Sequence, residues 1–511
     1  MSIKLSGPAL TALNQSSATY LDLSACAPKL LEKDSTLWGE AARAEAAIRL
    51  DWVGLPESSR DLLPELDALS AWARSKNLTN IILAGMGGSS LAPEVLAKCF
   101  GKKLTVLDST DPEQIKAAIP ANFANTAILV GSKSGSTIET ASQRALFEKL
   151  ITEAGLDIRD HMVIVTDPNS PLDIEARAAG LKVVNANPNV GGRYSALTAF
   201  GLVPAALMGI DVSVLLDDAA GVLQELAAPV AVATLLYELT EQAIAFYDAE
   251  STVPGLSDWI EQLVAESTGK DEKGRIPVVI EGAHSPVGGK IFTIAFAGAS
   301  ADLIVEGSLG EQFIFWELVT ALLSRAIGID PFNQPNVTEA KERTSALLSE
   351  WSDGVPPKSE SNFVEGDVEV FGAVTGNSLK EIARNFLVQE NYYFAIMAYL
   401  NRESDEAITQ LRAHIAQATS KPTTFGWGPR FLHSTGQFHK GGQLNGAFIQ
   451  ITSDENIDLQ IPGKNFSFAT LITAQALGDG QALTARKLPV IRFHLKDRRR
   501  GILQLLEAFK S

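Results

Sequence analysis

The sequence predicts an α/β protein built on doubly wound parallel sheets. Short apolar runs alternate with helical stretches from about residue 60 onwards, which is typical of parallel strands covered by helices on both faces. Turns rich in glycine or hydroxyl side chains follow two of these runs, as is common where a strand leads into a helix. The chain has 511 residues, 46% of them hydrophobic and 20% charged, which excludes a mainly disordered protein and is enough for about three folded units.

The charge and the cysteines exclude several functional classes. The formal net charge of −17 opposes general binding of nucleic acid, so an anionic ligand would need a local cluster of donors. Cys26 and Cys99 are too few for a disulfide framework and offer no metal-ligand spacing, so we expect a reducing cytoplasm. The first residues lack the continuous apolar region of a signal peptide. The charge-free stretch 194–210 is shorter than the roughly 20 residues of a membrane span, so we expect a buried core segment.

The first half of the chain divides into two expected segments. Residues 1–55 form an N-terminal helical leader, with one amphipathic helix over residues 37–53. Residues 56–225 form the first parallel-sheet domain, and its strands are expected at 80–85, 104–108, 126–131, 162–165 and 182–184.

The second half divides in the same way. Residues 226–390 form a second parallel-sheet domain, which begins with a connecting helix over 234–249 and continues with strands at 276–281 and 301–306 and a helix over 311–327. Residues 391–511 form a smaller C-terminal α/β segment, with a helix over 403–418 and strands at 392–400, 446–452 and 488–495.

The first candidate site is the glycine loop, residues 85–90, with the sequence GMGGSS. Glycines between a strand and a helix let backbone N–H groups approach an anion, and the helix N-terminus adds partial positive charge. Gly88 and Ser89 are the candidate donors. The spacing lacks the third glycine of the dinucleotide-binding pattern, so a nicotinamide or flavin cofactor is not expected.

The second candidate site is the hydroxyl loop, residues 131–137, with the sequence GSKSGST. It also follows an apolar run and opens a helix. An ordinary helix cap needs one hydroxyl group, whereas this loop offers four and a lysine, which suits a phosphate monoester. Because carboxyl ends of neighbouring parallel strands meet at one sheet edge, we expect the two loops to lie side by side and to bind one ligand.

These motifs and three others resemble known families. GMGGSSLAPEV and GSKSGSTIET are similar to the two halves of the sugar-phosphate isomerase (SIS) domain. Residues 187–195, NPNVGGRYS, and 331–341, PFNQPNVTEAK, resemble two signatures of the phosphoglucose isomerase family. Residues 426–442, GWGPRFLHSTGQFHKGG, resemble the isomerase half of bifunctional transaldolase/phosphoglucose isomerases. The resemblance implies two SIS-type domains and a C-terminal segment with a displaced catalytic loop.

The resemblance also implies an activity. The family interconverts glucose 6-phosphate and fructose 6-phosphate, in glycolysis and gluconeogenesis, by opening the sugar ring and transferring a proton through a cis-enediol. It needs no redox cofactor, and the resemblance implies a homodimer. No metal is expected, because no two histidines have metal-ligand spacing and even His433 and His439 are six residues apart. The acidic charge and the lack of a span-length apolar stretch predict no nucleic-acid or membrane partner. The phosphate would be held by the two loops, through Gly88, Ser89, Ser132, Lys133, Ser134 and Thr137.

The other site residues are carried over from the same motifs. Glu266 stands in an E-S-x-G-K context and would be the base, with Gln262 one turn before it on the same helical face. Arg193 follows two glycines and would stabilise the developing enediolate. Lys341 would act near the ring oxygen, and Gln334, seven residues earlier, would contact the substrate.

The ring-opening histidine is left open by the sequence. In the family it lies in a W-G-x-P-G-x-N-G-Q-H context between the glutamate and the second signature. Here that interval holds His284 without the context, whereas W-G-P and G-Q occur after the second signature, near His433 and His439. We rank His439 and His433 equally, ahead of His284, and infer that this block has moved along the chain.

Three alternatives to this isomerase remain at this point. A non-catalytic sugar-phosphate sensor would keep the loops but would not need Glu266 or Arg193. A glutamine-dependent amidotransferase module would need an N-terminal cysteine, and Ser2 follows Met1. A dual phosphoglucose/phosphomannose isomerase is open because Ser134 and Gly135 replace the usual threonine and bulky residue of the loop.

Overall fold

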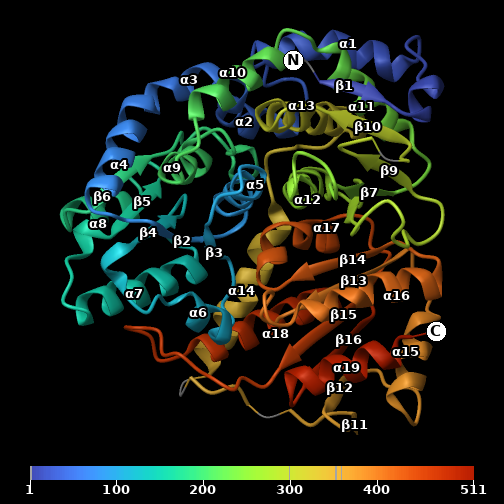
Figure 1. Ribbon diagram of the computed structural model, residues 1–511. Helices are drawn as coiled ribbons and strands as arrows, with labels where there is room; N and C mark the ends of the chain where they lie inside the picture. Colours follow the sequence, from blue (N-terminus) through green and yellow to red (C-terminus); the bar gives the residue numbers. More distant parts are fainter. Residues whose placement is uncertain (1–2, 299, 352–353, 358, 511) are drawn as a thin grey trace.

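The chain forms three sheets whose parallel strands share one order. The computed structural model describes residues 3–298, 300–351, 354–357 and 359–510. Figure 1 shows the first sheet on the left, the second at the upper right and the third at the lower right. The predicted α/β class with parallel sheets is confirmed.

The first sheet is parallel throughout and has the strand order β3-β2-β4-β5-β6. Its apolar runs lie in the interior, and its strands are β2 (Asn80–Gly85), β3 (Thr105–Leu107), β4 (Thr126–Gly131), β5 (Met162–Thr166) and β6 (Lys182–Asn185). The helices of this unit are α5 (Leu91–Cys99), α6 (Pro112–Ala118), α7 (Ile138–Glu153), α8 (Pro171–Ala178) and α9 (Ala199–Leu207). All five predicted strands are therefore confirmed to within a residue or two.

The second sheet has the order β1-β10-β9-β7-β8, and only β1 is antiparallel. Its strands are β1 (Lys4–Ser6), β7 (Ala243–Tyr247), β8 (Ile276–Val279), β9 (Phe292–Ala295) and β10 (Leu303–Glu306). Its helices are α10 (Val212–Val222), α11 (Ala227–Glu238), α12 (Leu256–Thr268) and α13 (Leu309–Ile327). The four parallel strands repeat the order of the first four strands of the first sheet.

The third sheet has the order β11-β12-β16-β15-β13-β14. Its strands β13, β14, β15 and β16 are parallel to one another. Its strands are β11 (Phe363–Glu365), β12 (Val368–Gly372), β13 (Tyr393–Ala398), β14 (Thr423–Trp427), β15 (Gly446–Ser453) and β16 (Val490–Leu495). The helices around it are α14 (Pro335–Glu350), α15 (Leu379–Leu387), α16 (Gln410–Thr419), α17 (Thr435–Gly441), α18 (Phe468–Ala485) and α19 (Arg498–Ala508). Four of its six strands, β13 to β16, lie in the expected C-terminal segment 391–511, whereas β11 and β12 lie before it in sequence.

The prediction of one helix over residues 234–249 is wrong. The helix α11 ends at Glu238, and the apolar run that follows is the interior strand β7, buried along its whole length between β8 and β9. Periodicity alone does not separate a short, fully buried strand from a buried helix, which is the reason for the error.

The first 55 residues are integrated into the fold. β1 pairs antiparallel with β10, and the helix α1 (Ala18–Leu31) packs on α11 and α13. The expected helix over 37–53 is shorter, as α2 (Glu40–Arg49), and is followed by the single turn α3 (Leu55–Ser58) and the longer helix α4 (Leu63–Ser75). The domain boundaries proposed above stay a prediction.

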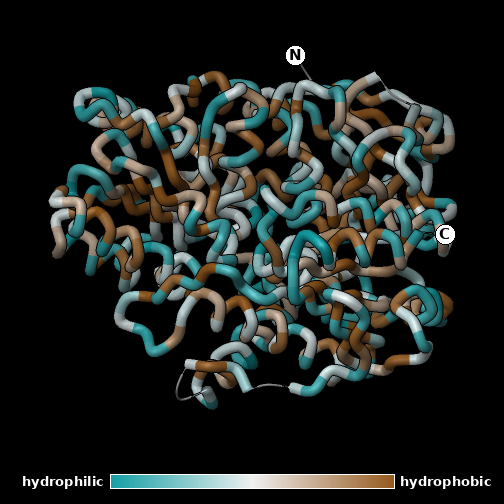
Figure 2. Tube along the Cα trace, turned by 60° about the horizontal axis from the view of Figure 1, so that its bottom comes forward, coloured by the Kyte–Doolittle hydropathy of each residue, from teal (hydrophilic) through white to brown (hydrophobic). Residues whose placement is uncertain are grey.

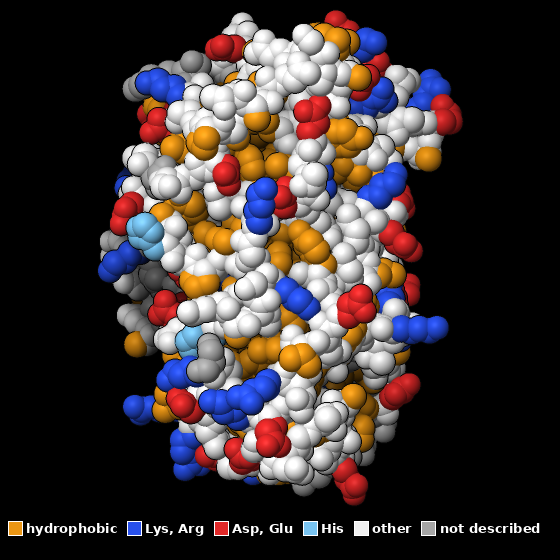
Figure 3. Space-filling view, turned by 90° about the vertical axis from the view of Figure 1, so that its right-hand side faces the viewer, with side chains coloured by type: hydrophobic (Ala, Val, Ile, Leu, Met, Phe, Trp, Pro, Cys, Tyr) orange, Lys and Arg blue, Asp and Glu red, His pale blue; other side chains and the backbone are white. Residues whose placement is uncertain are grey.

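Hydrophobic and hydrophilic stretches alternate along the whole trace (Figure 2), and most of the buried side chains are hydrophobic. The segment 194–210 is confirmed as core, because α9 within it is buried. Among the helices of the described residues, no single one is long and apolar enough to cross a membrane, although the bent pair α10 and α11 passes by length and composition. The face in Figure 3 carries scattered charges of both signs with apolar side chains between them.

Candidate active site

The glycine loop and the hydroxyl loop lie side by side, as predicted. They follow β2 and β4, which are neighbours in register from Asn80 opposite Thr126 to Gly85 opposite Gly131. β3, the strand that follows β2 in sequence, lies on one side of β2, and β4 lies on its other side. The strand order therefore reverses between β2 and β4, and the two loops flank this topological switch point. Open α/β sheets bind ligands at this place.

The glycine loop packs directly on the turn that carries Arg193. A Cβ atom on Gly88 would lie 1.9 Å from the carbonyl oxygen of Gly192, and one on Gly87 would lie 2.8 Å from Nε2 of Gln262. Gly87 also has a φ of +55°, which favours glycine. The two glycines therefore let the glycine loop lie directly against the Gly192 backbone and the Gln262 side chain.

The hydroxyl loop is held by its own side chains. Ser132 Oγ accepts a hydrogen bond from the Gly135 N–H at 3.1 Å, and the hydroxyl groups of Ser134 and Ser136 lie 2.7 Å apart. Gly135 has a φ of +76°, and a Cβ atom there would lie 2.4 Å from Cβ of Leu172. Backbone conformation and packing thus explain the glycine that departs from the family pattern.

Lys133 is engaged at the edge of this loop. Its Nζ lies 2.7 Å from an Asp167 carboxylate oxygen and 3.1 Å from the Pro188 carbonyl oxygen. Burial lowers the pKa of Lys133, and the ion pair with Asp167 opposes this shift only in part. The structure therefore directs this ammonium group to Asp167.

Arg193 is buried and held on every nitrogen. It lies in the turn η7 (Gly192–Tyr194) and is 3% exposed. Nε donates to Ser267 Oγ at 2.8 Å, and Nη1 donates to Gln334 Oε1 at 3.0 Å. Nη2 donates to the carbonyl oxygens of Pro331 and Asn333. A guanidinium group held by all its nitrogen atoms presents its positive charge in a fixed orientation.

Glu266 lies in the last turn of α12, between an amide and a guanidinium group. Nε2 of Gln262 donates to its Oε2 at 3.2 Å, and Nη1 of Arg193 lies 3.4 Å from its Oε1. The expected shared face of Gln262 and Glu266 is confirmed. The same Nε2 donates to the backbone oxygen of His433 at 2.8 Å, which brings the C-terminal block to this carboxylate.

His433 faces a buried carboxylate. It ends the turn η9 (Arg430–His433), and its Nε2 lies 3.2 Å from Oε1 of Glu139. Nε2 of Gln475 donates to the same oxygen at 2.7 Å. Burial alone would raise the pKa of Glu139, but the facing His433 ring and the Lys341 charge outweigh it and hold this pKa below its ordinary value.

A cavity of about 160 Å³ opens beside this pair. The hydroxyl loop forms one wall and α14 the other. The residues that line it include Ser134, Thr137, Glu139, Lys341, His433 and Gln475. Gln334 caps the start of α14 next to it. The cavity therefore joins the predicted phosphate loop to Lys341 and His433.

His439, one of the two candidates ranked first for ring opening, is not brought to this cavity. Its ring is 3% exposed, stacks on Tyr393 with centroids 5.7 Å apart, and lies edge-on to Phe448. Burial lowers the pKa of His439 to about 3. His284 lies in an exposed loop after β8. Among the three histidines, only His433 lines the cavity.

Three site residues were missed by the sequence reasoning. Glu139 lies within GSKSGSTIET, the motif of the hydroxyl loop, so that motif could have identified it. Gln475 lies on α18, far from the quoted motifs in sequence. Lys270 closes the E-S-x-G-K motif, and its Nζ donates to carbonyl oxygens of Asp330 and Asn333. Burial and the nearby Arg193 charge hold the pKa of Lys270 well below its usual range.

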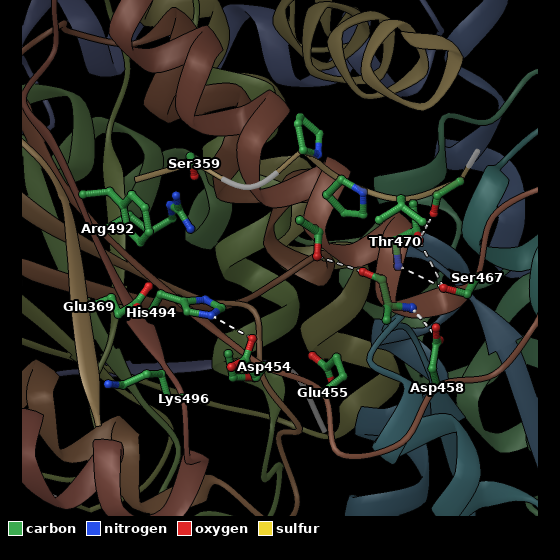
Figure 4. Close-up of a pocket in the computed structure, with 18 of the residues that line it drawn as sticks. Ser359, Glu369, Asp454, Glu455, Asp458, Ser467, Thr470, Arg492, His494 and Lys496 are labelled. Atoms are coloured by element: carbon green, nitrogen blue, oxygen red, sulfur yellow. Dashed lines mark hydrogen bonds and ion pairs between the residues drawn. The ribbon is translucent and has the colours of Figure 1, made fainter. Parts of the chain in front are cut away.

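A second, larger cavity of about 1000 Å³ lies on the third sheet (Figure 4). There His494 Nε2 lies 3.2 Å from Asp454, and the Arg492 guanidinium lies 3.8 Å above the Phe371 ring. Its described lining includes none of the predicted site residues. Within the same described part of the chain, no group of three or more His, Cys, Asp or Glu side chains is placed to hold a metal ion.

One family model matches part of the chain. Residues 60–272 match the model of the family described as phosphoglucose isomerase. The matched region holds the two loops, Arg193, Gln262 and Glu266, whereas Gln334, Lys341 and His433 lie beyond it in sequence and are brought to it by the fold.

Curated relatives cover only part of the chain. A glucose-6-phosphate isomerase from Thermus thermophilus is 34% identical over 252 residues, which is 46% of this chain and 59% of the relative. A probable glucose-6-phosphate isomerase from Haloarcula marismortui is 32% identical over 243 residues, which is 44% of this chain and 56% of the relative. The alignments thus span little more than half of these relatives.

A solved structure shares part of the fold. The crystal structure of a glucose-6-phosphate isomerase from Chlamydia trachomatis matches with a TM-score of 0.52 at 18% identity. The match covers 60% of this chain and 75% of that one.

Proposed function

We propose that the protein interconverts glucose 6-phosphate and fructose 6-phosphate. The observation that carries this proposal is the Gln262 amide, which donates to both the Glu266 carboxylate and the backbone of His433. This amide links the Glu266 carboxylate to the backbone of the segment that carries His433, which supports a site in which a carboxylate base and an imidazole act on one substrate next to two loops suited to a phosphate. An aldose–ketose isomerase needs these three elements together.

The loops would bind the phosphate. Ser89, Ser132, Ser134 and Thr137 offer hydroxyl groups, and Gly88 offers a backbone N–H at the N-terminal side of α5. Helix N-termini and successive N–H groups favour anions, even in a protein with a net charge of −17. Lys133 would contribute as a charge at the rim, since it is paired with Asp167.

His433 would open the sugar ring. When its Nε2–H donates to Glu139, Nδ1 is left as the proton acceptor, so the carboxylate sets the tautomer. Ring opening of glucose 6-phosphate removes the proton of the C1 hydroxyl and delivers one to the ring oxygen. His433 would take the first proton, and Lys341, which lines the same cavity, would stand near the ring oxygen.

Glu266 would then move a proton between C2 and C1. The carboxylate takes the proton from C2, the cis-enediol forms as O1 gains a proton, and the same carboxyl group returns the carbon-bound proton to C1 while O2 loses its proton. Arg193 lies 3.4 Å from Glu266 and would stabilise the negative charge of the enediolate. Gln334 holds Arg193 through its side-chain oxygen and would act mainly by orienting it.

The test is a coupled assay of the purified chain. Fructose 6-phosphate is supplied, and the glucose 6-phosphate formed is oxidised by its dehydrogenase and followed as NADPH absorbance. We expect turnover by the wild type and a loss of at least about 10²-fold in kcat for Glu266→Gln and His433→Asn. His284→Asn, in an exposed loop, is the matched control and should keep wild-type kcat.

Two results would contradict the proposal. Absence of turnover, with fructose 6-phosphate still raising the melting temperature, would instead indicate the sugar-phosphate sensor. Full activity of Glu266→Gln would remove the proposed base. The same assay with mannose 6-phosphate measures the dual specificity that Ser134 and Gly135 leave open.

We also propose that the protein acts as a cytoplasmic homodimer without nucleic-acid or membrane partners. The homodimer follows from the family that the motifs resemble. Light scattering coupled to gel filtration measures the mass. A value near the 54.6 kDa of one chain would refute the dimer.

A further inference from the structure

Gln437 makes hydrogen bonds with each polar group of its side chain. It lies on α17 and is 0% exposed. Its Nε2 donates to the carbonyl oxygen of Gly269 at 2.9 Å and to Oδ1 of Asn336 at 2.8 Å. Its Oε1 accepts from the backbone N–H of Asn336 at 3.0 Å. One amide therefore joins three segments that are far apart in sequence.

Each of these segments carries a residue of the proposed site. Gly269 ends α12, three residues after Glu266. Asn336 lies in the first turn of α14, two residues after Gln334 and five before Lys341. Gln437 itself follows His433 by four residues. In Figure 1, α12, α14 and α17 meet in the middle of the molecule, between the sheets.

The packing around Gln437 leaves no space for adjustment. A Cβ atom on Gly441 would lie 2.3 Å from Asn336 Oδ1 and 2.8 Å from the Gly269 carbonyl oxygen. A Cβ atom on Gly269 would lie 2.5 Å from Cα of Phe438. The segments thus approach each other at backbone distance, and the Gln437 amide sets their spacing.

We propose that Gln437 is a positioning residue, which sets the separation of Glu266, Lys341 and His433 by bridging α12, α14 and α17. This inference rests on the proposed function. Reaction rates depend steeply on such separations, since a misplacement of about 1 Å can cost about 10²-fold. A buried glutamine that only satisfies its own hydrogen bonds would affect stability and leave the chemistry unchanged.

The test compares Gln437→Leu with Gln312→Leu. Gln312 is also 0% exposed, and its amide donates to the Val305 carbonyl oxygen at 2.9 Å and accepts from Trp316 Nε1 at 3.0 Å, away from the site. Both variants should lower the melting temperature. We expect Gln437→Leu to lower kcat by about 10- to 100-fold, with inhibition by inorganic phosphate unchanged, and Gln312→Leu to keep kcat within about twofold.

A second pair of variants covers the case in which Gln437→Leu does not fold. Asn336→Asp keeps the oxygen that accepts from Gln437, whereas Asn336→Ala removes it. We expect Asn336→Ala to lower kcat and Asn336→Asp to restore most of it. Equal kcat values for these two variants, or for the two glutamine variants, would overturn the inference.

The two proposals fail in different ways. If the wild type does not turn over fructose 6-phosphate, the proposed function fails and the role of Gln437 fails with it. If the wild type is active, Glu266→Gln is inactive and Gln437→Leu behaves like Gln312→Leu, the function stands and only the positioning role is refuted.

Discussion

The buried histidine His439 makes the stability of the protein sensitive to acid. Its Nδ1 lies 3.0 Å from the Tyr393 hydroxyl, and aromatic rings surround it. Burial, with a smaller contribution from the adjacent Lys440 charge, lowers the pKa of His439 to about 3. The native state therefore holds this ring neutral at pH values where an unfolded chain would protonate it.

The magnitude follows from linkage. The unfolded histidine titrates near pH 6.5, so its contribution to stability is complete above that pH and falls as the pH drops from 6.5 towards 3. Each pH unit in this window costs about 1.4 kcal/mol, so lowering the pH from 7.5 to 5.0 costs about 2 kcal/mol. Above pH 6.5 the His439 contribution is flat.

The perturbation is His439→Leu, which removes the titrating ring. Urea unfolding at pH 7.5 and 5.0 is followed by circular dichroism and by tryptophan fluorescence, and coincident transitions justify a two-state analysis. We expect the wild type to lose about 2 kcal/mol more than the variant between these pH values. Other titrating groups occur in both proteins and cancel in the difference.

Two outcomes would refute this reasoning. Equal losses for wild type and variant would mean that His439 does not titrate differently on folding. The protein has six histidines, so the imidazole NMR signal that disappears in His439→Leu identifies this ring. A signal that titrates near pH 6.5 in the native protein would also contradict burial. The variant should keep isomerase activity at pH 7.5, because the ring does not line the cavity.

Three further predictions concern packing and charge. Gly88→Ala places a Cβ atom 1.9 Å from a backbone oxygen, so we expect a lower melting temperature and loss of activity; an unchanged melting curve would contradict this contact. Lys440→Met leaves the buried Asp479 without its partner at 2.6 Å and should cost about 3–5 kcal/mol in urea unfolding, most of it recovered when Asp479→Leu is added. Glu139→Gln keeps the shape but removes the charge that faces His433; kcat should fall by about 10²-fold, while inorganic phosphate inhibits as in the wild type.

Local patterns in the sequence were enough to predict several parts of the site. The strands β2 and β4 are short apolar runs followed by glycine- or hydroxyl-rich turns, and parallel strands place such turns at one edge of the sheet. Gln262 and Glu266 share a helical face because they are four residues apart. These relations depend on neighbours in sequence or on the geometry of one element.

Other features depended on contacts between distant segments. The choice among the histidines depended on which ring faces Glu139, 294 residues away, and which is enclosed by aromatic rings. Lys133 belongs to a motif suited to phosphate, yet its ammonium group pairs with Asp167. Residues 243–247 are all apolar, so periodicity does not distinguish a strand from a helix there. Their pairing with β8 and β9 makes this segment a strand.

The sequence by itself determined the α/β class, the two loops and the Gln262–Glu266 face, because hydrophobic period and turn chemistry act over a few residues. The tertiary structure alone decided that His433 and Lys341 join these residues. They lie on chain segments outside residues 60–272, and contacts between distant segments hold them there: Gln262 donates to the His433 backbone, and Lys341 lines the same cavity as the hydroxyl loop.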